Sequence, residues 1–294
     1  MSDPAGQSGA VCEPRQQAGC SQHIDDRQFA RWTRLLEGRA GLFIAPERKS
    51  FLASGLRARM RETGCEDLAE YYQLLSSPAM QAREWPLLVD QLTVHETCFF
   101  RHAPSMRLVE KVVLPEHSAS MTTFNAWSVA CSTGEEAYSL AMLIDHFYAG
   151  NSTARRFGVT GTDISLPALQ QARTGAYMDR RLKDIPEDFR ERYCTPVIQR
   201  RFEVEKELRE RVCFAQLNLR DVASAPMADM DLVFCQNLLI YYDRERRLEI
   251  VNSLSDCLRP GGVLVLGPGE LLNWQHPHME KVRYQDTLAY RRTD

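Results

Sequence analysis

Residues 124–144, FNAWSVACSTGEEAYSLAMLI, run from an apolar stretch through four small residues into a segment that opens on two glutamates. This order is typical of a buried parallel strand, a tight turn and a covering helix. Open α/β sheets bind nucleotides at the carboxyl end of such a strand, where small residues let a ligand approach the backbone. We therefore expect residues 131–134, Cys-Ser-Thr-Gly, to lie at a ligand site.

An acidic residue ends the next predicted strand. The apolar run at residues 157–162 leads to Asp163, 29 positions after Gly134. A carboxylate at the tip of the second strand is placed to accept hydrogen bonds from both hydroxyls of a ribose. The alternative is that Asp163 caps the following helix, although Ser165 fills that role equally well.

The first turn of the predicted helix at 135–147 indicates which class of ligand the site can bind. Phosphates favour a free helix N-terminus, but Glu135 and Glu136 place two carboxylates there and would repel a pyrophosphate. A ligand with a ribose, a cationic amino group and no phosphate suits the site better, and S-adenosylmethionine is such a ligand. The alternative is that both glutamates are only good first-turn residues, since acidic side chains stabilise a helix start.

Outward from this stretch, predicted strands and helices alternate. We expect strands at 123–129, 157–162, 212–217, 231–235 and 263–266, and helices at 135–147, 167–173 and 244–258. Alternation of this kind predicts an α/β fold with a mostly parallel, Rossmann-like sheet, to which residues 287–290 would add an antiparallel edge strand. Between about 194 and 214, Phe202 and Val204 alternate with charged residues, which predicts a small inserted antiparallel β-subdomain.

The N-terminal part of the chain differs in composition and periodicity. Residues 1–22 are rich in Gly, Ser, Gln and Ala and are predicted to be a disordered tail. Helical periodicity with glycine stop signals predicts an all-helical domain over residues 23–92. Residues 93–105 then form a linker, and residues 106–294 form the larger domain.

The overall composition excludes several classes of protein. The 294 residues are 44% hydrophobic with a formal net charge of −3, which argues against a fibrous or disordered chain and against a global field for nucleic acid or an anionic membrane. No apolar stretch approaches the roughly 20 residues of a membrane span. The nine cysteines include no C-x-x-C pair, which favours reduced thiols. We expect a cytoplasmic monomer without nucleic-acid or membrane partners.

Two histidines near the C-terminus have the superficial look of metal ligands. His276 and His278 flank Pro277, but acidic or cysteine partners at metal-binding spacing are lacking. We therefore expect no metal site.

Five motifs follow one another along the chain: TVHETCFFRH (93–102), WSVACSTGEEAYSLAM (127–142), TGTDIS (160–165), QLNL (216–219) and VFCQNLLIYYD (233–243). Through them the chain resembles the CheR-type chemotaxis receptor methyltransferases from about residue 24 to residue 292. The resemblance implies methyl transfer from S-adenosylmethionine to glutamate side chains of chemoreceptors, with S-adenosylhomocysteine as the product. It also implies a helical N-terminal domain, a linker and an S-adenosylmethionine domain with an inserted β-subdomain.

The resemblance also implies roles for individual residues. His95, Thr97 and Arg101 would contact the methionine end of the cofactor or close over it. Glu135 would hold its amino group and Asp163 its ribose. The adenine and the methyl group would be framed by Asn218, Leu219, Asn237 and Leu238. Family members that dock on a receptor-tail peptide usually carry a glycine-bearing turn in the β-subdomain, and since this chain has none there we expect no tail tether.

The implied reaction needs no general base. A glutamate side chain has an ordinary pKa near 4.3, so its carboxylate is already ionised at pH 7. Catalysis would come from alignment and exclusion of water. Arg101 and Tyr241 are the candidates for positioning the reactants, with a structural ion pair and a core-edge tyrosine as the alternatives.

The substrate must be acidic, and one run of the helical domain is basic. Residues 48–61 hold five basic residues and no acidic one. Arg57, Arg59 and Arg61 are predicted to receive the helical region of a chemoreceptor, unless the run is an ordinary solvated helix face. The rival functions are a small-molecule methyltransferase, a non-catalytic protein that senses S-adenosylmethionine and, at the level of fold, a nicotinamide dehydrogenase.

Overall fold

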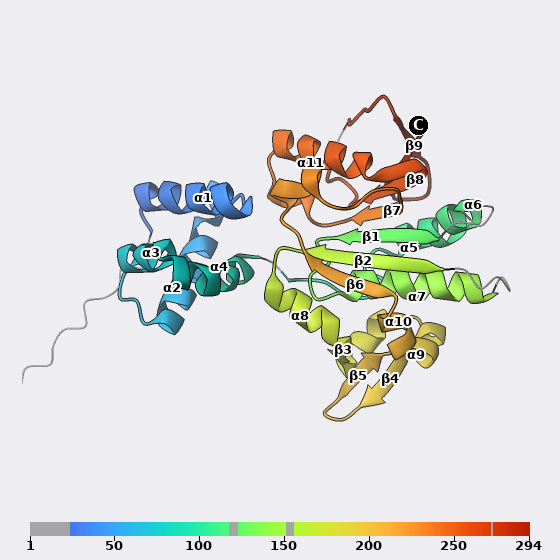
Figure 1. Ribbon diagram of the computed structural model, residues 1–294, viewed down its shortest axis with the longest axis horizontal. Coiled ribbons are helices and arrows are strands. Elements are labelled where there is room, and N and C mark those ends of the chain that lie inside the picture. The colour runs from blue at the N-terminus through green and yellow to red at the C-terminus, as the bar shows by residue number, and fades with distance from the viewer. Residues whose placement is uncertain (1–23, 94, 118–122, 151–155, 272) are drawn as a thin grey trace, which may run out of the picture.

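The computed structural model describes residues 24–93, 95–117, 123–150, 156–271 and 273–294. Figure 1 shows a small helical domain beside a larger domain that is built around a sheet. The tail expected at residues 1–22 lies outside the described residues. Within the described part of the chain, no helix combines the length and the apolar character needed to cross a membrane.

The small domain consists of helices that pack around one apolar core. Its elements are α1 (Asp26–Ala40), η1 (Pro46–Arg48), α2 (Lys49–Thr63), α3 (Leu68–Ser76) and α4 (Pro78–Leu92). Asp25 starts α1 with a reciprocal capping box, and Gly41 and Gly64 end α1 and α2 in the left-handed conformation. Trp32 and Tyr71 are fully buried at the centre of the domain.

The larger domain contains a seven-stranded sheet in the order β6-β2-β1-β7-β8-β10-β9. The pairs from β6 to β8 are parallel, and β10 is antiparallel to β8, which confirms the predicted sheet. The prediction that residues 287–290 form the edge is wrong, because β9 pairs with the outer side of β10. The strands are β1 (Phe124–Val129), β2 (Phe157–Asp163), β6 (Val212–Gln216), β7 (Met230–Cys235), β8 (Leu258–Leu266), β9 (Met279–Val282) and β10 (Leu288–Arg292).

Helices cover both faces of this sheet. Successive side chains of a strand point to opposite faces, and in β1 Ala126 packs in the same apolar cluster as α7 while Trp127 packs with α11. The helical elements of the domain are α5 (Ala103–Leu108), η2 (Val109–Val113), α6 (Leu114–His117), α7 (Glu135–Gly150), α8 (Leu166–Thr174), η4 (Leu219–Ser224), η5 (Leu239–Tyr241) and α11 (Arg244–Asp256).

A second, three-stranded antiparallel sheet is inserted between β2 and β6. Its order is β3-β5-β4, from β3 (Ala176–Met178), β4 (Cys194–Val197) and β5 (Arg201–Val204). The alternation at Phe202 and Val204 does mark one of these strands, and both side chains are buried. The short elements η3 (Asp179–Asp184), α9 (Glu187–Tyr193) and α10 (Lys206–Arg209) complete the insertion.

Two of the contacts that join the helical domain to the larger one lie at the ends of α1 and α4. Gly41, at the end of α1, lies so close to η4 that an added Cβ would be 3.3 Å from both Asn218 Oδ1 and Arg220 Cβ. At the end of α4, Asp90 accepts a hydrogen bond from the Ser165 hydroxyl at the start of α8. The helical domain therefore stands at the carboxyl ends of the parallel strands (Figure 1), where the ligand site was expected.

Candidate functional site

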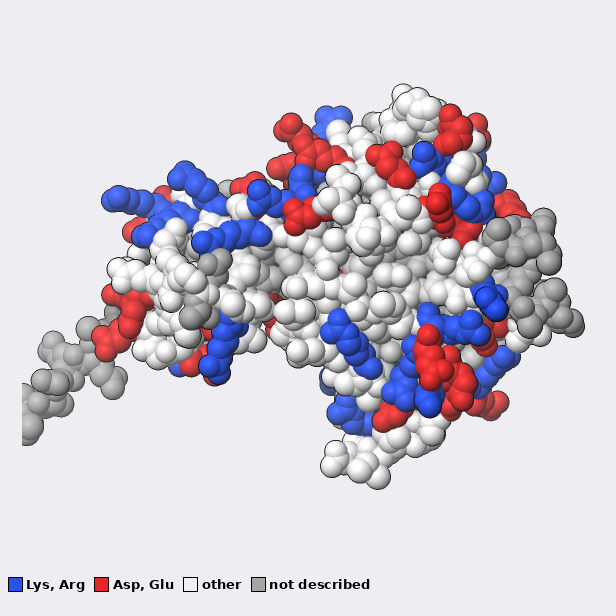
Figure 2. Space-filling view, in the orientation of Figure 1, with Lys and Arg blue, Asp and Glu red and all other residues white. Residues whose placement is uncertain are grey.

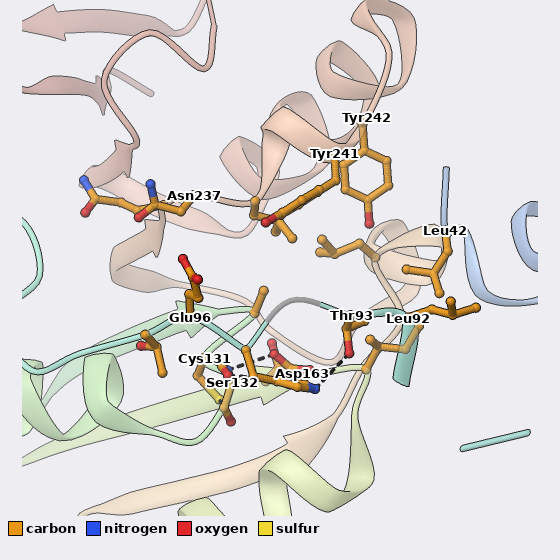
Figure 3. A pocket seen from close by; sticks show the side chains of 18 of the residues that line it. Leu42, Leu92, Thr93, Glu96, Cys131, Ser132, Asp163, Asn237, Tyr241 and Tyr242 are labelled. Atoms are coloured by element: carbon orange, nitrogen blue, oxygen red, sulfur yellow. Dashed lines mark hydrogen bonds between the residues drawn. The ribbon is translucent and has the colours of Figure 1, made fainter. Parts of the chain in front are cut away.

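A cleft opens between the two domains at the carboxyl ends of the parallel strands. Its wall comes from the loop at 42–44, the linker at 93–101, the turn at 130–132 and the segments that follow β2, β6 and β7. The empty space, its open mouth included, is about 1180 Å³. Figure 3 shows Asp163 and Ser132 on one side of this space and Tyr241 and Tyr242 on the other.

Asp163 closes the end of β2 and holds the adjacent turn. It is 8% exposed, and its two carboxylate oxygens accept the backbone N–H of Ser132 at 2.8 Å and of Ser165 at 2.9 Å. Burial raises its pKa, an effect that these backbone donors oppose. The helix-capping role belongs to Ser165, whose hydroxyl accepts the N–H of Ala168 at 3.1 Å. The carboxylate of Asp163 thus keeps acceptor capacity for a ligand in the cleft.

The two glutamates at the start of α7 face different surroundings. Glu135, the predicted amino-group ligand, is not part of the cleft wall: it accepts the Thr133 hydroxyl at 2.6 Å and lies 3.9 Å from the guanidinium of Arg181. Glu136 does line the cleft and accepts the Ser128 hydroxyl at 2.6 Å. Burial raises the pKa of Glu136 to about 8. A desolvated carboxyl group in the wall is suited to receive a cation, and it is the second glutamate, not the first, that occupies this position.

Gly134 has a packing role rather than the ligand-facing one we expected. Its φ is +94°, and an added Cβ would lie 2.8 Å from Ala172 and 3.0 Å from the Tyr177 hydroxyl, on the side of α8 and β3. Glycine is therefore required so that the turn can approach these elements. The residues of the turn that face the cleft are Cys131 and Ser132.

The linker brings three predicted residues, His95, Thr97 and Arg101, into the cleft wall. His95 bridges the domains, because its Nε2 lies 2.9 Å from Asp90 Oδ1 and its Nδ1 lies 3.3 Å from Ser132 Oγ. The hydrogen bond to Asp90 raises the pKa of His95. Arg101 donates to the carbonyl of Glu96 at 2.7 Å and is close enough to lower the pKa of Glu136 through its charge.

The opposite wall carries the remaining predicted residues. Those that line the cleft there are Asn218, Leu219, Asn237, Leu238 and Tyr241. Asn237 has a φ of +58°, a conformation that asparagine tolerates better than most residues, so the chain turns sharply at the end of β7. Buried Glu270 stabilises this turn, because its carboxylate accepts the N–H of Leu239 at 3.1 Å and of Gly267 at 2.8 Å.

The predicted docking arginines, which lie outside the cleft wall, do not share one environment. Arg59 forms a bidentate pair with Glu84, with both N–O distances at 2.9 Å, and Tyr71 donates to the same carboxylate at 2.8 Å. Glu84 is 3% exposed. Arg59 is thus committed to the core of the helical domain and is not available for docking, whereas Arg61 is exposed and Arg57 is half-buried.

Replacing Arg59 with alanine is therefore expected to destabilise the helical domain. The change leaves the buried carboxylate of Glu84 without its cation, which costs about 3 kcal/mol for a pair of this kind. Urea unfolding measures the effect, and Arg61→Ala is the matched control, because removal of an exposed arginine changes stability by about 0.5 kcal/mol or less. Equal stability of the two variants would contradict the structural role of Arg59.

Several residues of the cleft wall were not among the predicted site residues, and Arg48, Glu96, Glu136 and Tyr242 are among them. Glu96 and Tyr242 stand inside the motifs quoted above, so their positions beside Thr97 and Tyr241 were a usable signal. Arg48 belongs to the helical domain, and its approach to the cleft depends on how the two domains pack, which local sequence patterns do not report.

Comparison with known proteins assigns both domains. The description "CheR methyltransferase, SAM binding domain" matches residues 95–288, and "CheR methyltransferase, all-alpha domain" matches residues 27–93. The chain belongs to the CheR methyltransferase family. It is a methyltransferase that depends on S-adenosylmethionine, and the predicted family and fold are confirmed.

Curated relatives match over most of their length. The chain is 34% identical over 264 residues to "Chemotaxis protein methyltransferase 1" of Pseudomonas aeruginosa, which covers 87% of this chain and 94% of the relative. It is 31% identical over 277 residues to "Chemotaxis protein methyltransferase" of Escherichia coli, with 93% and 92% covered. It is 30% identical over 268 residues to "Chemotaxis protein methyltransferase Cher2" of Pseudomonas putida, with 89% and 96% covered.

The donor set of the cleft fits S-adenosylmethionine. The ligand carries a ribose diol, a cationic amino group and a carboxylate but no phosphate. The cleft offers the buried carboxylate of Asp163, the desolvated carboxyl group of Glu136 and the guanidinium of Arg101. The amino group and the carboxylate of the ligand thus each have a complementary group in the wall, Glu136 and Arg101 respectively.

Proposed function

We propose that this protein methylates glutamate side chains in the cytoplasmic helical region of chemoreceptors and forms glutamate methyl esters there. The observation that carries the proposal is a pair of carboxyl groups, the buried Asp163 and the half-buried Glu136, in an interdomain cleft of a CheR-family methyltransferase. We further propose that it acts as a monomer in the cytoplasm. The helical unit of about residues 23–92 would meet the receptor and the unit of about residues 106–294 would bind the cofactor.

The proposed cofactor residues combine the roles that the family resemblance implies with the side chains that line the cleft. Asp163 would accept the ribose hydroxyls, and Glu136, in place of Glu135, would accept the amino group. Arg101 would hold the cofactor carboxylate, with His95 and Thr97 beside it. The ring and the methyl group would be bordered by Asn218, Leu219, Asn237 and Leu238. When bound, S-adenosylmethionine supplies an electrophilic methyl group.

The protein's own part in the reaction is to bind, orient and exclude water. The substrate carboxylate is already ionised at pH 7. The reaction therefore needs no general base: His95 is hydrogen-bonded to Asp90 and Ser132 and links the domains, and burial holds the pKa of the Cys131 thiol well above its usual value. Tyr241, which Figure 3 shows beside the cavity, would shape the path of the incoming side chain. Alignment of the reacting atoms then provides the rate enhancement.

Receptor docking is proposed for the basic side of the helical domain. Figure 2 shows Lys and Arg side chains gathered over α1 on the face in view. On α2, Arg57 and Arg61 are four residues apart and so lie on one side of the helix, while Arg59 is held by Glu84. An acidic receptor helix would be attracted to Arg57 and Arg61 through charge complementarity.

Charge reversal of Arg57 and Arg61 is expected to weaken receptor methylation without weakening cofactor binding. The double variant Arg57→Glu/Arg61→Glu should raise the KM for a receptor fragment by about tenfold or more, since like charges then face the receptor helix. The affinity for S-adenosylhomocysteine, measured by calorimetry, should stay unchanged. An unchanged KM would refute the docking surface while leaving the proposed chemistry untouched.

Transfer of label tests the function itself. Radiolabelled S-adenosylmethionine and a cytoplasmic receptor fragment should give a base-labile labelled fragment, because methyl esters of glutamate hydrolyse in alkali. A fragment with glutamine at its methylation-site glutamates is the control. If saturating cofactor binds but no label is transferred, the protein is a sensor of S-adenosylmethionine. If label appears only in small molecules of a cell extract, it is a small-molecule methyltransferase.

A further inference from the structure

Tyr177 of the inserted three-stranded sheet reaches the turn that forms one side of the cofactor cleft. It stands in the middle of β3, opposite Phe202 of β5, and is 4% exposed. Its hydroxyl donates a hydrogen bond of 2.7 Å to the backbone carbonyl of Thr133. Thr133 directly follows Cys131 and Ser132, the residues of the turn that line the cleft. The insertion therefore contacts the cofactor site, although its strands lie outside the cleft wall.

The position of Tyr177 follows from the local fold. Gly175 ends α8 in the left-handed conformation, with a φ of +62°, so the chain turns directly into β3. Successive side chains of a strand point to opposite sides, and the next residue, Met178, is exposed while Tyr177 points inward. Gly134 leaves room for the hydroxyl, because an added Cβ there would lie 3.0 Å from it. The tyrosine can thus reach the turn only because a glycine stands in the turn.

The ring of Tyr177 packs against the linker as well. Its centroid lies 5.0 Å from that of Phe99, in an edge-to-face contact with an interplanar angle of 81°. Phe99 is 1% exposed and stands between Thr97 and Arg101, which both line the cleft. One side chain therefore contacts two segments of the wall, the turn through its hydroxyl and the linker through its ring.

The backbone of the turn is held from two directions. On one side, Asp163 at the end of β2 accepts the N–H of Ser132 at 2.8 Å. On the other, Tyr177 donates to the carbonyl of the next residue, Thr133. A segment that is fixed before the ligand arrives does not have to be ordered during binding, and this lowers the entropic cost of association. The hydroxyl of Tyr177 is therefore suited to raise the affinity for the cofactor without touching it.

We propose that Tyr177 is a positioning residue for S-adenosylmethionine, which holds the turn at 131–134 and the linker at Phe99 in the arrangement that the cofactor binds. The inserted sheet thereby contributes to cofactor affinity through its contact with the cleft wall. This role concerns the cofactor site alone and does not depend on the nature of the methylated substrate.

The hydroxyl can be removed without removing the ring. Tyr177→Phe keeps the contact with Phe99, and its affinity for S-adenosylhomocysteine, measured by calorimetry, should fall by about three- to tenfold through loss of one hydrogen bond. Tyr138→Phe is the matched control, because this buried tyrosine of α7 donates to the carbonyl of Ala172 at 3.0 Å and not to the turn. The control should lower the melting temperature by a similar amount but keep the wild-type affinity.

Amide hydrogen exchange provides a readout that a purely structural role would not change. In the free Tyr177→Phe protein, the amides at 131–134 should exchange faster than in the wild type, because the turn opens locally. Bound S-adenosylhomocysteine should restore their protection. In Tyr138→Phe, exchange at 131–134 should match that of the wild type.

Three outcomes would overturn the role of Tyr177. A folded Tyr177→Phe protein with wild-type affinity would show that the hydroxyl does not position the turn. An equal loss of affinity in Tyr138→Phe would show a general loosening of the domain. Reduced affinity without faster exchange at 131–134 would place the cause outside the turn. Since no receptor fragment enters these measurements, failure to methylate receptors would refute the proposed function and leave the role of Tyr177 standing.

Discussion

Replacing Asp163 with alanine is expected to reduce the affinity for S-adenosylhomocysteine by about 10²- to 10⁴-fold, as two hydrogen bonds to a charged acceptor contribute about 1.5–3 kcal/mol each. The side chain is placed to accept both ribose hydroxyls. It also holds the N–H groups of Ser132 and Ser165, so the substitution releases the turn that forms the floor of the cleft. The loss of hydrogen bonds to the ligand and the loss of the preformed cleft floor both lower the affinity.

The measurement is calorimetry, with melting temperature as the test of folding. Asp163→Asn is the milder variant, because an amide keeps the shape and one acceptor oxygen, and we expect it to fall between wild type and alanine. Asp243→Ala is the matched control: this aspartate caps α11 by accepting the N–H of Arg246 at 2.9 Å and lies outside the cleft wall. It should lose stability but keep its cofactor affinity. A folded Asp163→Ala protein with near-normal affinity would overturn the ribose assignment.

Most of the fold could be predicted because its signals are local. Strand–turn–helix order, glycine stop signals and period-2 alternation each depend on residues that are close in the chain. The edge strand of the sheet could not be predicted, because apolar and polar residues alternate only weakly over residues 279–282. This segment forms β9 because one side of β10 is free to pair with it. The three-residue strand β3 could not be predicted either, because it is defined only by its pairing with β5.

The candidate site was predictable to the level of the motif but not of the side chain. Asp163, Asn237 and Tyr241 line the cleft as their places after strands suggest. Adjacent residues in the first turn of a helix, however, point about 100° apart, and a motif cannot say which of Glu135 and Glu136 faces the ligand. Likewise, Arg59 is the one of the three arginines in α2 that pairs with the buried Glu84. The two residues are 25 positions apart in the chain, so only the tertiary structure shows the pair.

Replacing Glu136 with glutamine is expected to weaken cofactor binding by about 10- to 100-fold through loss of one charge-assisted hydrogen bond, while Glu135→Gln leaves it near the wild-type value. The two variants differ by one position in the chain and remove the same charge. They therefore distinguish the glutamate that faces the cleft from the one that faces Thr133 and Arg181. The opposite ranking would restore Glu135 as the amino-group ligand.

The raised pKa of Glu136 allows a second, independent test of whether this carboxyl group binds the amino group of the cofactor. With a pKa of about 8 in the free protein, this carboxyl group is protonated at pH 7. A bound ammonium group favours the ionised form, so binding should release protons at pH 7, and the release should decrease as the pH rises through about 8. Affinity should accordingly rise with pH up to about 8 and then level off. The stability of the free protein changes with pH in the opposite direction to the affinity. The Glu136 carboxyl group loses its proton at a lower pH in the unfolded chain than in the folded protein, so its contribution to stability falls as the pH rises from about 4.5 to 8.

Titrations in two buffers of different ionisation enthalpy count the released protons. Other charged groups in the same wall must be separated from Glu136, namely His95, whose pKa is raised by Asp90, and the neighbouring charges of Arg101 and Glu270. Glu136→Gln makes this separation, since any release that persists in the variant belongs to other groups such as His95 and Asp163, and release that disappears belongs to Glu136. Because Glu135→Gln keeps the cleft carboxyl group, it should release protons as the wild type does. Equal proton release from Glu136→Gln and wild type would show that Glu136 does not meet the cation of the cofactor.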